Sequence, residues 1–154
     1  MALPKKKAVY PAKEPEKPAL MLSDTEAPPY ELSPQQKIAK IKSGISKKDL
    51  TSLKDAASLD YDMLAELLSV ARVTLINKKG EEKFNRNVSE KIMALADLYS
   101  YGFDIFGNGD KFNAWMNEPN AALGQIAPIE LSDTIIGIQE VKHLVGRIAF
   151  GIFS

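Results

Sequence analysis

Residues 106–151 read FGNGDKFNAWMNEPNAALGQIAPIELSDTIIGIQEVKHLVGRIAFG, and this stretch decides the fold. Gly107 and Gly109 are expected to end one helix, because glycine adopts left-handed backbone angles without steric cost. Asp110 is a suitable cap for the short helix that follows. Farther on, apolar residues recur at the spacing of a helix, and they are Val141, Leu144, Val145 and Ile148. The stretch therefore predicts short helices that lead into a longer final one.

The residues that follow this final helix are unusually apolar. Phe150, Ile152 and Phe153 stand where polar, frayed sequence is usual. Gly146 and Gly151 lie on either side of Phe150, and small residues allow another surface to approach closely while aromatic side chains provide anchors. The residues alone leave two interpretations open. The segment either folds back onto the chain's own helices or contacts another protein.

The composition is that of a globular protein without catalytic equipment. A chain of 154 residues with 45% apolar side chains fits one ordinary domain or two very small ones. It has no cysteine and a single histidine, His143, which excludes disulfides, cysteine-ligated zinc and histidine-rich metal sites. No apolar run approaches the roughly twenty residues that cross a bilayer, and the start lacks a secretory signal. We therefore expect a cytoplasmic protein that needs no cofactor and is not an enzyme.

The chain divides into three segments of different composition. Residues 1–33 hold six of the nine prolines, with five lysines against five acids, which predicts a flexible arm. Residues 34–83 carry ten basic and seven acidic side chains, a net charge of +3. Residues 84–154 carry five basic and eight acidic side chains, a net charge of −3. Such a split suits a segment that faces nucleic acid joined to one that faces protein.

Serine or aspartate caps predict three helices in the middle segment. Ser33 stands before a proline and three residues before a glutamine, which is the pattern of a capping box. Ser46 and Asp60 stand at the expected starts of the other two helices. Residues 71–79 are expected to form a fourth helix, which Gly80 ends.

The last two of these helices have the layout of a helix-turn-helix reader of DNA. Arg72 and Asn77 are the candidate base readers, because guanidinium and amide groups pair two-fold with guanine and adenine. Thr74, Lys78 and Lys79 suit phosphate contacts or helix capping. The alternative is an ordinary helical hairpin whose basic end is solvated.

The longest predicted helix opens at Asn87, which stands three residues before a glutamate. Its apolar residues recur at three- and four-residue intervals, and they are Ile92, Leu95, Ala96, Tyr99, Phe103 and Phe106. This stripe is expected to be core or dimer interface. Leu98 and Tyr101 lie off the stripe and give the helix a second apolar side, which a second copy of the chain can cover. Trp115 is expected to be a core aromatic.

The C-terminal motifs resemble those of a known family. They are Phe106-Gly107, Trp115-Met116, Pro119 through Gly124, Pro128 through Leu131, Glu140-Val141 and Leu144 through Gly151. Together they closely resemble the toxin-binding domain of the Xre/MbcA/ParS antitoxins over residues 84–154, and a helix-turn-helix-like region from about residue 46 fits the same family. The family usually has a basic residue after its Asn-Pro-Ala-Leu-Gly-Gly motif. This chain has Ile126 there, so no contact of that basic residue carries over.

The resemblance implies an all-α protein in which a helix-turn-helix (Xre-like) half, residues 34–83, precedes a small helical toxin-binding domain, residues 84–154. It implies a homodimeric antitoxin of a type II toxin-antitoxin system. The partner implied is a RES-domain toxin, a class that consumes NAD or transfers ADP-ribose from it. The tail is then expected to block the active-site cleft of the toxin. The tail residues implied are Gly146, Arg147, Ile148, Phe150, Gly151, Ile152 and Phe153.

The resemblance also implies that the protein binds operator DNA and represses its own operon. The alternative from another class is a free-standing helix-turn-helix transcriptional regulator whose C-terminal half only dimerises. An enzyme is disfavoured, because the sequence shows no nucleophile–base arrangement, metal-ligand set or cofactor loop.

Overall fold

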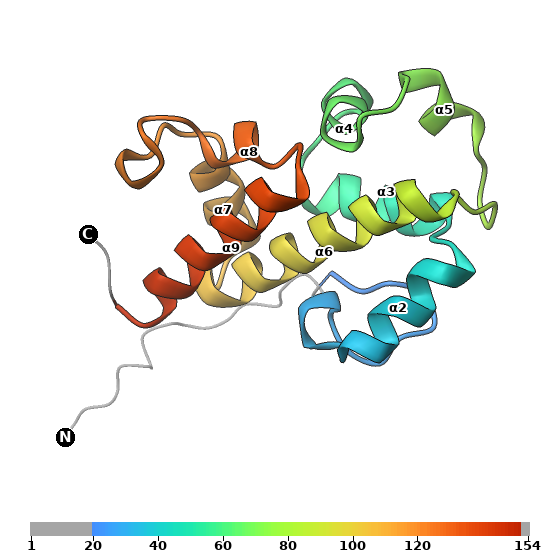
Figure 1. Cartoon of the computed structure of the whole chain (residues 1–154), viewed down its shortest axis with the longest axis horizontal. Helices are drawn as coiled ribbons and strands as arrows, with labels where there is room; N and C mark the ends of the chain where they lie inside the picture. Colours follow the sequence, from blue (N-terminus) through green and yellow to red (C-terminus); the bar gives the residue numbers. More distant parts are fainter. Residues whose placement is uncertain (1–19, 152–154) are drawn as a thin grey trace.

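The computed structural model describes residues 20–151. Over this range the chain forms eight α-helices, two 3-10 helices and no strand, which confirms the all-α prediction (Figure 1). The earlier elements are η1 (Pro29–Glu31), α2 (Pro34–Ser43), α3 (Lys47–Ala56), α4 (Tyr61–Leu68) and α5 (Arg72–Asn77). The later ones are α6 (Arg86–Phe106), α7 (Gly109–Met116), η2 (Ala121–Leu123), α8 (Pro128–Leu131) and α9 (Ile135–Ala149). None of the helices in residues 20–151 is both long and apolar enough to cross a membrane.

The three predicted caps of the middle segment are confirmed. The Ser33 hydroxyl accepts a hydrogen bond from the amide of Gln36 at 3.1 Å, and the glutamine side chain accepts one in return from the Ser33 amide at 2.8 Å. Ser46 accepts from the third amide of α3 at 3.1 Å, and Asp60 accepts from the third amide of α4 at 2.8 Å. These side chains satisfy amides that have no partner inside the helix, so they fix where each helix begins.

Two predicted helix starts are wrong, each by two residues. Asn87 does not cap α6, because the cap is Asn85, whose side chain accepts a hydrogen bond from the Val88 amide at 2.9 Å. Asp110 lies inside the first turn of α7, and Asn108 caps that helix through the amide three residues on, at 3.0 Å. In both cases an earlier asparagine already satisfies a free amide of the first turn.

α6 is the central helix, and η1, α2, α7 and α9 all pack against it (Figure 1). The side chains of its predicted stripe up to Tyr99 are buried. Leu98, on the other side, is 0% exposed, because the chain's own core covers it. The expectation that a second copy covers this side is therefore wrong at Leu98. One hydrophobic cluster includes residues from both sides of the boundary expected between residues 83 and 84.

An aromatic cluster fixes α7 on the C-terminal half of α6. Phe112 of α7 is fully buried. Its ring lies edge-on to three rings of α6, with centroids 5.2 to 5.9 Å away, and these are Tyr99, Phe103 and Phe106. Trp115 stacks on Phe112 at 5.6 Å and packs against the core while half-buried. Gly102 makes room for the cluster, since a Cβ there would lie 2.3 Å from atoms of the Phe112 ring.

Residues 20–33 pack on the core, although we expected them to belong to a flexible arm. Their buried leucines are Leu20, Leu22 and Leu32. Ser23 donates from its amide and its hydroxyl to the buried carboxylate of Asp49, at 2.9 and 2.7 Å. Lys40 donates to the carbonyl of Ser23 at 2.6 Å. This part of the proline-rich segment is therefore docked, because leucines between the prolines give it an apolar side to bury.

An ion-pair triad joins the N-terminal and C-terminal helices. Asp97 of α6 is buried, and its carboxylate pairs with Lys37 of α2 and with Lys142 of α9. The distance from Lys142 Nζ to Asp97 Oδ1 is 2.6 Å. A buried carboxylate requires such partners, because removal of an ion from water costs several kcal/mol. Asp97 therefore ties α2 and α9 to the same point of the central helix.

We predict that Gly102→Ala lowers the free energy of unfolding by about 1–2 kcal/mol, because overpacking at Phe112 outweighs the gain in helix propensity. Gly146→Ala in α9 is a matched control, since a Cβ there would meet only the Tyr101 hydroxyl, at 3.4 Å. The control is expected to be neutral or stabilising by up to about 1 kcal/mol. Urea unfolding measures both, and equal stability of the two variants would contradict the packing described for Phe112.

A second prediction concerns the triad. Asp97→Asn is expected to cost about 1–2 kcal/mol of stability, a value reduced from that of a fully buried pair because Lys142 is partly exposed. Asp55→Asn removes an exposed carboxylate that pairs with the half-buried Lys54, and it is expected to cost less than about 0.5 kcal/mol. Thermal unfolding of the two variants side by side tests the difference. An Asp97 variant no less stable than the Asp55 variant would rule out a structural role for the triad.

Candidate partner-binding site

The final helix, α9, has one face in the core and one exposed to solvent. Thr134 caps it by accepting a hydrogen bond from the amide of Gly137 at 2.9 Å. Its buried side chains include Ile138, Val141, Leu144 and Val145, which confirms the predicted helix over the residues at helical spacing. Gly137 allows α8 and α9 to approach closely, since a Cβ there would lie 1.7 Å from the carbonyl oxygen of Leu131. These contacts fix the direction in which the helix points.

The exposed face of α9 has an apolar side chain near each end. Ile136 near its start is 75% exposed, and Phe150, just after its last residue, is 81% exposed. Between them lie polar side chains at helical spacing, which include His143 and Arg147, both exposed. An exposed phenylalanine loses the stabilisation of burial, so Phe150 is the side chain of this face that gains most when another surface covers it.

The structure places only some of the predicted tail residues together. Gly146, Arg147 and Phe150 line one groove. Ile148 is half-buried and does not line it, and Gly151 ends the helix with a positive φ of 73°. Ile152 and Phe153 lie outside the described residues. Phe150 is 81% exposed, so its ring is not buried against the chain's own helices, as one of the two interpretations expected.

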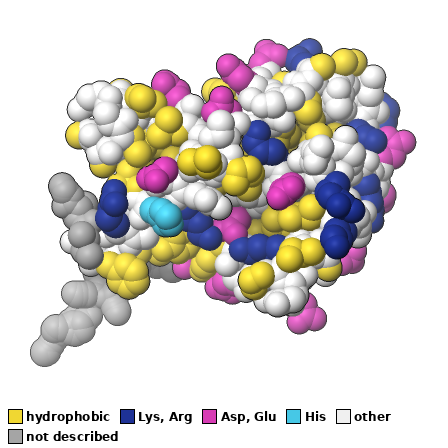
Figure 2. Space-filling model, in the orientation of Figure 1, with side chains coloured by type: hydrophobic (Ala, Val, Ile, Leu, Met, Phe, Trp, Pro, Cys, Tyr) yellow, Lys and Arg dark blue, Asp and Glu magenta, His cyan; other side chains and the backbone are white. Residues whose placement is uncertain are grey.

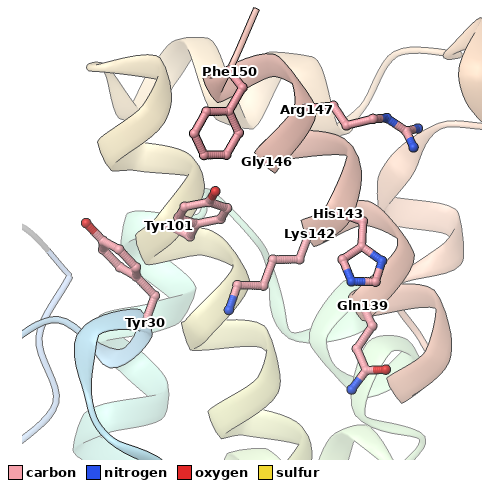
Figure 3. Close-up of a pocket in the computed structure, with 8 residues that line it drawn as sticks. All are labelled: Tyr30, Tyr101, Gln139, Lys142, His143, Gly146, Arg147 and Phe150. Carbon is pink, nitrogen blue, oxygen red and sulfur yellow. The ribbon is translucent and has the colours of Figure 1, made fainter. Parts of the chain in front are cut away.

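The groove lies between η1, α6 and the last turns of α9 and has a volume of about 990 Å³ (Figure 3). Its lining residues are Tyr30, Tyr101, Gln139, Lys142, His143, Gly146, Arg147 and Phe150. Figure 3 shows the rings of Tyr30, Tyr101 and Phe150 on one side of α9, while Arg147 and His143 project on the other. The groove therefore combines aromatic surface with basic side chains.

Sequence reasoning missed Tyr30, which belongs to the expected arm. Its amide donates to the Ser100 hydroxyl at 3.1 Å, and its own hydroxyl donates to Asp104 at 2.7 Å. Burial raises the pKa of Tyr30, and the hydrogen bond to the Asp104 carboxylate raises it further. The ring lies 5.3 Å from that of Tyr101. No local signal predicts this contact, because the paired residues are 70 and more positions apart in the chain.

The groove has features of a binding surface. Lys142 is paired with Asp97 and lies 5.5 Å from the centre of the Tyr101 ring. Within residues 20–151 no group of three His, Cys, Asp or Glu side chains is placed to hold a metal ion. In Figure 2 the single histidine lies on the face shown, beside an acidic side chain and close to basic and apolar ones. Such a mixture of exposed aromatic and charged side chains is typical of a protein-binding surface.

The predicted DNA-contacting residues lie on and beyond a short helix. α5 covers only Arg72–Asn77, so Lys78 and Lys79 follow its end, and the helix expected over residues 71–79 is too long. Lys47 of α3 explains the early end, because its ammonium group donates to the carbonyls of Leu75 and Lys78 at 3.0 and 2.8 Å. Of the predicted residues, Arg72, Thr74, Asn77 and Lys79 are exposed, and Lys78 is half-buried.

Three observations describe the surroundings of α5. Arg72 pairs with Asp62 at 3.0 Å, with both side chains mostly exposed. Val73 is 56% exposed, so the helix also presents an apolar side chain to solvent. Basic side chains gather at the end of the molecule where α6 begins (Figure 2), and Lys48 lies there close to the segment after α5, since its amide donates to the Gly80 carbonyl at 2.8 Å. Sequence reasoning did not single out Lys48.

Several known proteins are similar to this chain. It is 30% identical over 136 residues to the Prs ADP-ribosylating antitoxin of Sphingobium sp. (strain YBL2), which covers 81% of this chain and 85% of the relative. It is 31% identical over 117 residues to antitoxin Xre of Yersinia enterocolitica, which covers 74% of this chain and 78% of the relative. Antitoxin Xre of Photorhabdus laumondii is 38% identical over 77 residues, 49% of this chain and 51% of the relative.

Among solved structures, the M. tuberculosis MbcT-MbcA toxin-antitoxin complex contains a chain of similar fold. The TM-score is 0.52 at 18% identity, over 68% of this chain and 93% of that chain. The family described as the antitoxin Xre/MbcA/ParS C-terminal toxin-binding domain matches residues 102–151, the range that holds the end of α6 and all of α9. Together with the extent of the Sphingobium match, this shows that the chain belongs to the Xre/MbcA/ParS family of antitoxins.

Proposed function

We propose that this chain is the antitoxin of a type II toxin-antitoxin pair and binds its toxin through the C-terminal end of α9. The observation that carries the proposal is Phe150, which is 81% exposed at the end of a helix whose other face is fixed in the core. The toxin-binding domain of the family matches residues 102–151, which include the whole of α9 and six of the eight residues that line the groove. The MbcA structure to which the fold is similar was solved in complex with a toxin.

The toxin is proposed to carry a RES domain and to consume NAD or transfer ADP-ribose. This proposal is supported by the sequence resemblance and by the relative named Prs ADP-ribosylating antitoxin. Neutralisation is proposed to be steric, with the segment from Gly146 to Phe153 covering the active-site cleft. Arg147 provides the charged contact, and Ile148, Phe150, Gly151, Ile152 and Phe153 provide the surface that loses water on binding.

A staged truncation tests this proposal. A chain that ends at Gly146 keeps the core residues of α9 but loses Arg147 and Phe150, so its toxin affinity is expected to fall at least about 100-fold. A chain that ends at Gly151 keeps both and isolates the contribution of Ile152 and Phe153. Each is co-expressed with the toxin encoded by the neighbouring gene, and growth is measured. Full protection by the shorter chain would show that the end of α9 is not the toxin-binding site.

A second proposed function is binding of operator DNA by a dimer of the chain, with repression of its own operon. It is supported by three exposed side chains on α5, namely Arg72, Thr74 and Asn77, and by basic side chains near the end of that helix. Lys78 and Lys79 are proposed to contact phosphates. The alternative is a free-standing regulator whose C-terminal half only dimerises. Absence of toxin binding by the unaltered chain would favour this alternative.

The double change Arg72→Ala and Asn77→Ala is expected to weaken binding to a palindromic promoter fragment about 10- to 100-fold, since each base contact is worth about 1–3 kcal/mol. A mobility shift at two salt concentrations measures the affinity, which is expected to fall as salt rises. Lys111→Ala, in the acidic C-terminal segment, serves as the control. An unaltered affinity of the double variant would remove these two residues from the DNA contact.

A further inference from the structure

The groove at the end of α9 has a positive mouth. None of its eight lining residues is acidic, whereas Lys142, His143 and Arg147 are basic (Figure 3). The nearby carboxylate of Asp104 accepts a hydrogen bond from the Tyr30 hydroxyl at 2.7 Å. The sequence around it is acidic, since residues 84–154 carry eight acidic against five basic side chains. Glu140 is exposed on the same helix but does not line the groove. The positive mouth is therefore a local feature and not part of a generally basic surface.

The three basic side chains differ in how their charge is used. Lys142 pairs with Asp97 at 2.6 Å, and because that carboxylate also pairs with Lys37, it offsets only part of the charge of Lys142. Arg147 is exposed and makes no ion pair with any residue from 20 to 151, and the same holds for His143 one turn earlier. A cation in the last turn of a helix also interacts favourably with the helix dipole. This effect explains a basic residue at position 147 but not the exposed ring of Phe150. Arg147 is thus the charge that a partner meets first.

An apolar surface lies on the other side of α9 from this charge (Figure 3). Gly146 has no side chain, and the nearest atom to a Cβ there would be the Tyr101 hydroxyl at 3.4 Å. Phe150 lies on the same side of α9 as Tyr101 and is 81% exposed (Figure 3). Tyr30, held by Ser100 and Asp104, extends the aromatic surface into the N-terminal segment. An apolar side chain of a partner therefore finds aromatic surface around Gly146.

We propose that the partner presents an acidic protein segment to this groove. The segment crosses the exposed end of α9. One of its carboxylates pairs with Arg147 beside His143, and an apolar side chain on the other side of the helix covers Gly146 between Tyr101 and Phe150. A guanidinium group holds a carboxylate through two parallel hydrogen bonds, which sets orientation as well as charge. The inference rests on the proposed toxin binding and deepens it. It states the chemistry of the toxin surface and assigns Tyr30 and Tyr101 to the interface.

A phosphate-bearing ligand such as a dinucleotide is the other anion that this mouth attracts. Phosphates bind where several backbone amides converge, typically at the start of a helix. The groove lies at the opposite end of α9, where free carbonyl groups carry partial negative charge. A single carboxylate can pair with the Arg147 side chain without approaching those carbonyl groups. The geometry therefore favours an acidic protein segment over a phosphate-bearing ligand.

Calorimetric titration of the full-length chain with the toxin encoded by the neighbouring gene tests the inference. Arg147→Glu is expected to weaken binding about 100-fold or more, and Arg147→Lys about 3- to 10-fold, because lysine keeps the charge but not the paired hydrogen bonds. Arg86→Glu is the matched control. It reverses an exposed charge in the first turn of α6, where an acidic residue favours the helix, and its affinity is expected to stay within about twofold.

The outcomes separate the inference from the proposed function. If the unaltered chain binds the toxin and Arg147→Glu binds it with the same affinity, the inference of an acidic segment is wrong, while the proposal of toxin binding stands. Absence of binding by the unaltered chain overturns both. Restored binding between Arg147→Glu and a toxin variant with one acidic residue changed to arginine supports the inference.

Two further measurements guard the result. If circular dichroism shows that Arg147→Glu loses helix content, its weaker binding no longer tests the ion pair. The salt dependence of the complex of the unaltered chain then tests the inference. Affinity is expected to fall about tenfold between 50 and 500 mM salt, and an unchanged affinity overturns the inference. NAD titrated into the chain alone is expected not to bind. Binding of NAD that Arg147→Lys weakens would assign the groove to a phosphate ligand and overturn the acidic segment.

Discussion

The packing of α9 against α6 is the contact on which the rest of the structure depends. Buried side chains of α9 lie on the central helix, and Lys142 closes the contact from the edge by pairing with Asp97. The same carboxylate holds α2 through Lys37, so the two halves of the chain share one electrostatic anchor. Because this contact fixes one face of α9, the other face is presented to solvent in a single orientation. The exposed end of the helix is thus a rigid surface with a defined direction.

The proposed binding site draws on both ends of the described chain. η1 brings Tyr30 against Tyr101, and α9 brings Arg147 and Phe150 to the same groove. A surface held from several elements loses little side-chain freedom when a partner binds, which favours affinity. The N-terminal segment therefore has a structural part in the site, and the docking of Ser23 on Asp49 explains how it stays in place.

Local chemistry made much of this fold predictable, and non-local contacts made the remainder unpredictable. Ser33, Ser46 and Asp60 start their helices as expected, because a cap acts on amides only two or three residues away. The final helix and its buried face follow from spacing in the same way. The docking of residues 20–33, the burial of Leu98 and the place of Tyr30 in the groove depend on contacts between distant segments. The composition of residues 1–33 predicted a flexible arm, but residues 20–33 pack on the core because their leucines are buried there.

Hydrogen exchange of the full-length chain, followed with and without its toxin, tests the central claim most directly. If the toxin covers the rigid end of α9, amides from residue 139 to 150 and around η1 exchange more slowly in the complex, while those of α5 are unchanged. Slower exchange confined to α4 and α5, with α9 and η1 unaltered, would contradict the account. It would place the partner on the opposite half of the molecule.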